Sequence, residues 1–167
     1  MKVAEQIARV LVAEGVEYLP CYPRQMLIDP CIAAGIKPVI CRQERVGAGI
    51  ADGISRSTNG DKIGVFSMQG GQGIENSFPG AAQLYGDNVP ALLMPGGANT
   101  DRAHTPPTFD AVDGFRTVTK WGATVNRPHR VSELLRRAFQ LMKNGKPGPV
   151  LIEVPGDMVD GGGIARR

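Results

Sequence analysis

Hydrophobic and polar positions follow two alternating patterns along the 167-residue chain. Segments with apolar residues every three or four positions predict amphipathic helices, and short solid apolar runs predict buried strands. Helices are expected at 2–14, 25–34, 44–58 and 128–143, and one more after the loop GGQG at 70–73. Strands are expected at 17–23, 37–42, 62–69, 90–97, 115–125 and 147–155.

Prolines limit several of these elements. Pro30 must start a turn or kink the helix at 25–34. Pro79 is expected in the first turn of the helix after GGQG, or at its start, because a missing N–H is tolerated there. Residues 97–115 show no period and contain two adjacent prolines, so we expect a long loop. Long loops in compact domains commonly serve a function.

The alternation of strands and helices predicts a three-layer α/β/α fold with a mostly parallel central sheet. The length fits one domain, expected over residues 1–159, followed by a flexible tail or the start of a linker at 160–167, DGGGIARR. Ligands of such sheets bind beyond the carboxyl ends of the strands. Glu44 and the GGQG loop are both expected at that edge.

Composition narrows the range of functions. Hydrophobic residues make up 42% of the chain, which permits a core, and the net charge of +3 is mild and scattered. Nucleic acid and membranes are therefore not expected as partners. Cys21, Cys31 and Cys41 each neighbour apolar residues and form no C-x-x-C pair, which predicts buried thiols in a reducing compartment and no metal site. The cytoplasm is the expected location.

Glu44 is the most informative single residue. It follows a predicted strand directly and precedes a helix that contains Gly47, Gly49 and Gly53. Each glycine costs roughly 1 kcal/mol of helix stability, so another helix, a second subunit or a flat ligand must approach this backbone closely. From position alone, Glu44 could equally be an acidic residue that complements the helix dipole.

Other common catalytic patterns are absent from the sequence. GGQG lacks the Lys and Ser/Thr of a phosphate-binding P-loop, and no G-x-S-x-G occurs. His104 and His129 have no partner at metal-ligand spacing.

Several ordered motifs resemble one enzyme family. RQERVGAGIADGISRSTNG is similar to the segment around the catalytic glutamate of thiamine diphosphate enzymes of the acetolactate synthase and pyruvate decarboxylase group. MQGGQGIEN resembles the glycine-rich turn and Asn of that family, and YGDNVPALLMPGG resembles its D-S-x-P-L-V strand. TFDAVDGFRTVTKWGATV and GKPGPVLIEVPGDM resemble the end of the same domain. The resemblance covers residues 3–159, the whole pyrimidine-binding domain.

The resemblance implies a role for each matched residue. Glu44 would be the acid that hydrogen-bonds to a ring nitrogen of the aminopyrimidine and so activates the cofactor thiamine diphosphate. The rest of the pyrimidine pocket would be formed by Pro23, Gly71, Gln72, Gly73 and Asn76. Phe109 matches a position near the substrate, and Arg24, Gln25 and Asp110 are further substrate candidates.

Departures from the family pattern leave the identity of the substrate undetermined. Gln72 replaces the proline of Gly-Pro-Gly, Arg24 and Gln25 replace the glycines of Y-P-G-G, and Asp110 replaces a glutamine. The resemblance therefore implies chemistry on 2-oxoacids, either C–C ligation or decarboxylation, rather than acetolactate synthesis specifically.

The partners implied by the resemblance lie outside this chain. The family binds diphosphate and Mg²⁺ mainly through a separate domain with a G-D-G motif and a later N-N, which this sequence lacks. We expect the chain to need that domain or subunit, to be inactive alone, and to act in a homodimer or tetramer; FAD binding in the full enzyme stays open. The alternatives are the alpha subunit of a split 2-oxoacid decarboxylase of the sulfopyruvate type, and a non-catalytic α/β binding module.

Overall fold

A six-stranded parallel sheet forms the centre of the computed structural model, which describes residues 1–23 and 26–160. The strand order is β2-β1-β3-β4-β6-β5, and every neighbouring pair is parallel. The strands are β1 (Tyr18–Cys21), β2 (Lys37–Ile40), β3 (Gly64–Met68), β4 (Ala91–Gly97), β5 (Trp121–Thr124) and β6 (Val150–Pro155). The parallel sheet expected from the sequence is confirmed.

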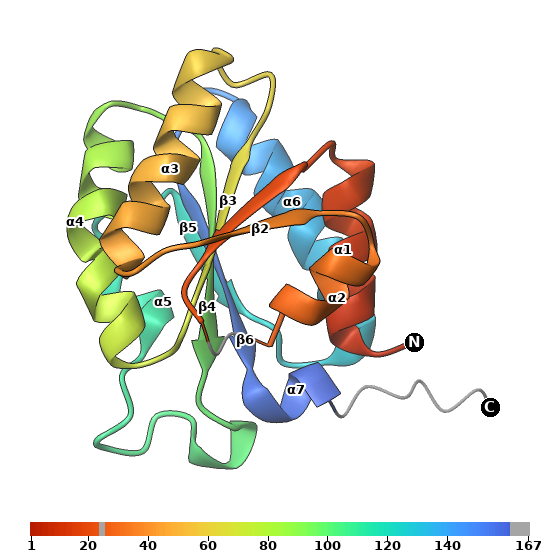
Figure 1. Cartoon of the computed structure of the whole chain (residues 1–167). Coiled ribbons are helices and arrows are strands. Elements are labelled where there is room, and N and C mark those ends of the chain that lie inside the picture. Colours follow the sequence, from red (N-terminus) through yellow and green to blue (C-terminus); the bar gives the residue numbers. More distant parts are fainter. Residues whose placement is uncertain (24–25, 161–167) are drawn as a thin grey trace.

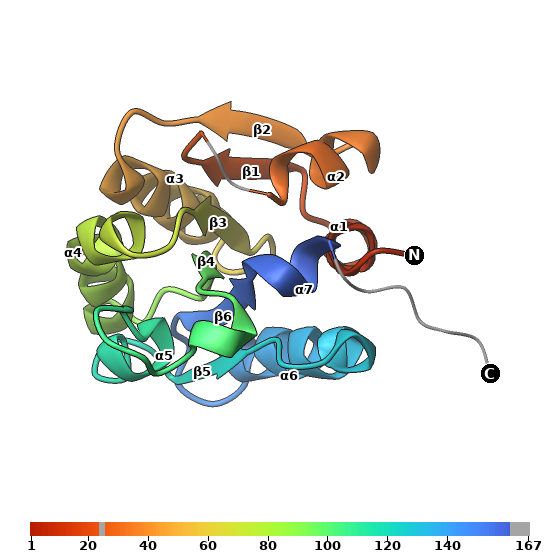
Figure 2. The same ribbon diagram turned by 90° about the horizontal axis from the view of Figure 1, so that it is seen from below.

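Helices cover both faces of the sheet, which confirms the predicted three-layer fold (Figures 1 and 2). One layer contains α1 (Val3–Ala13), α2 (Ile28–Ala33), α6 (Val131–Lys143) and α7 (Gly156–Asp160). The other contains α3 (Glu44–Ser57), α4 (Gln72–Gly86) and α5 (Ala111–Gly114). Two short 3₁₀ helices, η1 (Thr100–Arg102) and η2 (Pro128–Arg130), complete the described elements.

Each face of the sheet has its own apolar core. All five residues of β3 are buried, as expected for a strand that helices cover on both sides. Side chains alternate across the sheet, so Val65 joins the core under α1 and α6 while Phe66 joins the core under α3 and α4. None of the described helices is long and apolar enough to cross a membrane.

Pro79 differs from its prediction. It lies in the middle of α4 rather than in the first turn, because the helix already begins at Gln72. An interior proline removes one backbone hydrogen bond. Pro79 is exposed, and the buried face formed by Ile74, Ala81 and Leu84 holds the helix together around it.

Three other boundaries also shift. The helix expected at 25–34 begins at Ile28, which places Pro30 in its first turn, where no N–H partner is needed. The long loop expected at 97–115 contains η1 and α5. The strand expected at 115–125 is reduced to β5, because Phe115 ends the turn of α5 as a fully buried anchor. Of the predicted tail, residue 160 ends α7, and residues 161–167 lie outside the described residues.

Candidate functional site

Glu44 lies at the carboxyl edge of the sheet, where the chain passes from β2 into α3. It is the first residue of α3, and only 6% of it is exposed. The side-chain amide of Asn76, on α4, donates a hydrogen bond of 2.6 Å from Nδ2 to Glu44 Oε2. The helix N-terminus also favours negative charge at this position. A buried carboxyl group is thus held from two neighbouring helices.

The turn between β3 and α4 shapes the space beside this carboxyl group. Gly71, the N-cap of α4, has φ 61° and ψ −119°, a backbone conformation that residues other than glycine rarely adopt. Gly73 faces Glu44: a Cβ built there would lie 3.1 Å from Glu44 Oε1 and 2.6 Å from Gln69 Cγ. Any side chain at this position would therefore crowd the carboxyl group. We call Glu44, Gln69, Gly73 and Asn76 the Glu44 cradle.

Two further residues predicted for the pyrimidine pocket, Gln72 and Pro23, have exposed side chains. Gln72 is the first residue of α4 and is exposed. Pro23 is exposed in the turn after β1. The substrate candidates Arg24 and Gln25 lie outside the described residues.

The glycines of α3 fall into two groups. Gly47 faces the core, where an added Cβ would lie 2.3 Å from the ring of Phe66, so this glycine permits close packing within the chain. A Cβ at Gly49 or Gly53 would meet no atom within 4 Å. These two lie on an exposed face together with Val46, which is 48% exposed. Packing within the chain explains the first glycine but not the other two.

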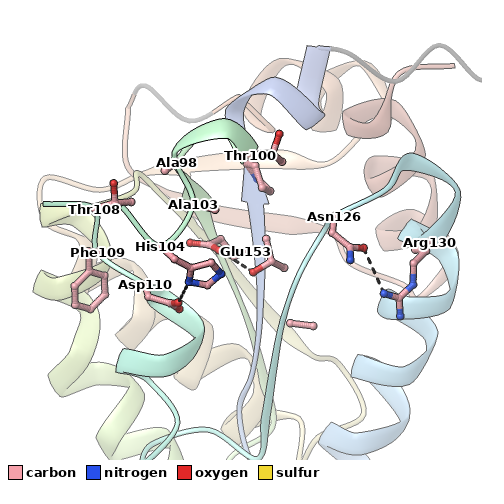
Figure 3. Close-up of a pocket in the computed structure, with 13 residues that line it drawn as sticks. Ala98, Thr100, Ala103, His104, Thr108, Phe109, Asp110, Asn126, Arg130 and Glu153 are labelled. Atoms are coloured by element: carbon pink, nitrogen blue, oxygen red, sulfur yellow. Dashed lines mark hydrogen bonds and ion pairs between the residues drawn. The ribbon is translucent and has the colours of Figure 1, made fainter. Parts of the chain in front are cut away.

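Phe109 and Asp110 lie at a separate cleft of about 530 Å³ at the ends of β4, β5 and β6 (Figure 3). The loop between β4 and α5 forms one wall, and β5, η2 and β6 form the other. None of the cradle residues is among the described residues that line it. The lining comprises Ala98, Thr100, Ala103, His104, Thr108, Phe109, Asp110, Ala123, Thr124, Asn126, Arg130, Glu153 and Pro155.

Glu153 is the cleft residue that the sequence interpretation missed. It lies on β6 between buried apolar neighbours, and Thr124 Oγ1 donates a 2.8 Å hydrogen bond to its Oε2. Burial raises the pKa of Glu153; the hydrogen bond from Thr124 opposes this rise, and the charge of Asp110 adds to it. The only available signal was a single acid inside the apolar run VLIEVP.

The cysteines and histidines take no part in the cradle. All three cysteines are buried, as predicted, and burial raises the pKa of Cys21 to about 11 and of Cys31 to about 12. Those two thiols therefore stay protonated at neutral pH. His104 pairs with Asp110 across 3.0 Å at the cleft, and His129 is exposed in η2. In the part of the chain that the structure describes, no three His, Cys, Asp or Glu side chains are grouped to hold a metal ion.

Comparisons with known proteins give one consistent result. The family described as "Thiamine pyrophosphate enzyme, N-terminal TPP binding domain" matches residues 1–117. The probable acetolactate synthase large subunit of Methanocaldococcus jannaschii is 31% identical over 166 residues, which cover 96% of this chain and 28% of that protein.

Two further relatives bear the same name. The acetolactate synthase large subunit of Haemophilus influenzae is 31% identical over 163 residues, covering 94% of this chain and 28% of its own length. The acetolactate synthase large subunit of Porphyra purpurea is 36% identical over 126 residues, which cover 74% of this chain and 21% of that protein. The chain thus spans 28% of the length of the first two relatives.

Proposed function

Because the chain belongs to the thiamine pyrophosphate enzymes as their N-terminal TPP-binding domain, we propose that the Glu44 cradle receives the aminopyrimidine ring of thiamine diphosphate. One observation supports this most directly. A carboxyl group that is only 6% exposed lies at the ligand edge of the sheet, beside a glycine where any side chain would crowd that carboxyl group.

The cradle fits the chemistry of the ring. Asn76 Nδ2 donates to Glu44 Oε2, so that oxygen is occupied as an acceptor. A proton on the carboxyl group would therefore be held at Oε1, on the side of Gly73, where it can be given to a ring nitrogen. Gly71, Gln72 and Gly73 would line the ring with backbone, and Pro23 would close the pocket from the end of β1.

When bound, thiamine diphosphate supplies a carbon nucleophile that attacks the carbonyl of a 2-oxoacid. The part of this chain is to hold the ring, through Glu44 and Asn76, and to exchange a proton with it at Glu44 Oε1. This is general acid–base work by a positioned carboxyl group, an effect typically worth about 10²–10⁴-fold in rate.

Activity on 2-oxoacids is proposed for the whole enzyme rather than for this domain alone. We propose that a further domain or subunit binds the diphosphate and Mg²⁺, and that a dimer or higher oligomer closes over the cradle in the cytoplasm. The exposed face of α3 at Val46, Gly49 and Gly53 supports a subunit contact there. The named relatives do not favour a split decarboxylase subunit or a non-catalytic module.

The proposal is tested by Glu44→Gln in the enzyme assembled with its diphosphate-binding domain. We expect thiamine diphosphate to bind within about tenfold of the wild-type affinity, while exchange of the cofactor's C2 proton slows by about 100-fold or more. Glu75→Gln, an exposed glutamate on α4, is the matched control. Calorimetry measures binding and NMR measures exchange. Equal exchange rates in the two variants would remove Glu44 from the mechanism.

A further inference from the structure

The segment 98–111 forms one wall of the cleft in Figure 3, and its two ends are tied to the same part of the chain. At its start, the backbone N–H and the hydroxyl of Thr100 both donate to the carboxylate of Asp157 on α7, the N–H at 3.1 Å. At its end, the backbone of Ala111 lies close enough to the carboxyl group of Glu153 on β6 to lower its pKa, against the larger rise caused by burial. Two acids four positions apart in the sequence thus hold both ends of one loop.

The site of Glu153 is built closely around its side chain. A Cβ at Gly97 would lie 2.8 Å from Glu153 Cγ and 3.2 Å from Oε1, so only glycine fits at that end of β4. Thr124 on β5 donates to Oε2 from the other side. The carboxylate therefore joins β4, β5 and the start of α5 at one point.

The loop between these two ties is itself ordered by Asp110. Its Oδ1 accepts the backbone N–H of Asp113 at 2.9 Å and so caps α5, while its Oδ2 pairs with His104 Nδ1. His104 has φ 60°, a left-handed conformation that persists only where surrounding contacts determine it. Phe109 lies against Gly114, where an added Cβ would be 2.6 Å from its ring.

We infer that Glu153 and Asp157 are positioning residues, which clamp segment 98–111 at both ends and fix Phe109 and Asp110 at the wall of the cleft. This inference rests on the proposed function for the identity of the substrate, a 2-oxoacid. Hydrogen bonds to ionised groups are stronger than neutral ones, and the bonds from Thr100 to Asp157 are of that kind. Releasing one point should loosen the loop before it affects the rest of the domain.

Charged groups around Glu153 make the clamp sensitive to pH. Asp110 and His104 face it from the loop, and Arg130 lines the same cleft from η2. Burial raises the pKa of Glu153, so it takes up a proton at a higher pH than an ordinary glutamate. A Glu153 carboxyl group released into water would return to its ordinary pKa, so opening of the clamp releases a proton at pH values above 4.5. The clamp should thus hold more firmly on acidification and loosen as the pH rises.

The first measurement is hydrogen–deuterium exchange in the full enzyme that contains this domain. We expect amides of residues 98–111 to exchange at least tenfold faster in Glu153→Ala and in Asp157→Ala. Glu17→Ala, an exposed glutamate that pairs with Lys62, is the matched control and should leave this segment unchanged. Thr124→Val removes one donor without changing the charge and provides a milder version if Glu153→Ala does not fold. Unchanged exchange in the folded variants would overturn the clamp.

The second measurement connects the clamp to the proposed reaction, with pyruvate as the probe. In Glu153→Ala we expect KM to rise about tenfold while kcat changes less than threefold and thiamine diphosphate affinity less than twofold. Glu153→Gln keeps one acceptor oxygen, so it should restore most of the KM and abolish its rise with increasing pH. Faster exchange with an unchanged KM would refute the positioning role. Failure of the wild type to bind thiamine diphosphate would instead refute the proposed function and leave the exchange test valid.

Discussion

Alanine substitution at two glycines of α3, only two positions apart, should change the free energy of unfolding in opposite directions. Gly47 faces Phe66, and Gly49 faces open space. Changing either residue to alanine adds one methyl group and improves helix propensity by roughly 1 kcal/mol. Because that gain is common to both variants, the difference between them reports only what surrounds each position.

The structure gives the magnitude of that difference. A Cβ at Gly47 would lie 2.3 Å and 2.7 Å from two ring atoms of Phe66, whose side chain is fully buried. Overpacking of this kind costs typically about 1–3 kcal/mol. Because contacts of 2.3 Å and 2.7 Å belong at the upper end of that range, we expect Gly47→Ala to lose up to about 2 kcal/mol net, and Gly49→Ala to gain about 0.5–1 kcal/mol.

Urea unfolding of the two variants provides the assay. The midpoints should shift to opposite sides of the wild-type value with an unchanged slope, because the surface exposed on unfolding stays the same. A stabilised Gly47→Ala would contradict the described packing of α3 on β3. In the assembled enzyme, Gly49→Ala should weaken subunit association if this face is covered there. Unchanged association would remove the face from the proposed contact.

Three further predictions concern side-chain partners. Asn76→Leu should destabilise the domain by about 1–2 kcal/mol in urea unfolding, because it removes the bond to the buried Glu44 carboxyl group, and this loss should vanish when Glu44 is already alanine. Asp52→Asn should cost about 1–2 kcal/mol by the same assay, because Asp52 is 5% exposed and pairs with a half-exposed Arg56; no loss would mean that the pair is fully screened. Glu153 has a pKa raised above 4.5, so folding favours its protonated form, and stability should fall as pH rises through the window above 4.5. Replacing Glu153 with glutamine should flatten that slope in unfolding titrations, and an unchanged slope would contradict the raised pKa.

Elements with a strong internal period were predictable from the sequence. α6 buries Val131, Leu134, Leu135, Ala138, Phe139 and Met142 on one face, the stripe that its spacing predicts. β3 is a solid apolar run, and it occupies an interior position of the sheet. In both elements the local pattern and the tertiary packing favour the same structure.

Other features depend on contacts that a single sequence does not reveal. Pro79 is tolerated inside α4 because the buried face of that helix outweighs one lost hydrogen bond. β5 is short because Phe115 packs into the core instead of continuing the strand. Glu153 resembled an ordinary strand residue, since its partners Thr124 and Gly97 belong to other strands. Its environment arises only when the sheet assembles.

The two ends of the described chain emerge on the same flank of the molecule. Val3 on α1 and Val159 on α7 belong to one apolar core, and Figure 1 shows both ends on the side away from α3 and α4. A fluorescent reporter or surface tether joined at the N-terminal end, before α1, would therefore lie away from the exposed glycine face. An immobilised form of this domain should leave that face open to an incoming partner, which makes capture experiments on a sensor surface practical.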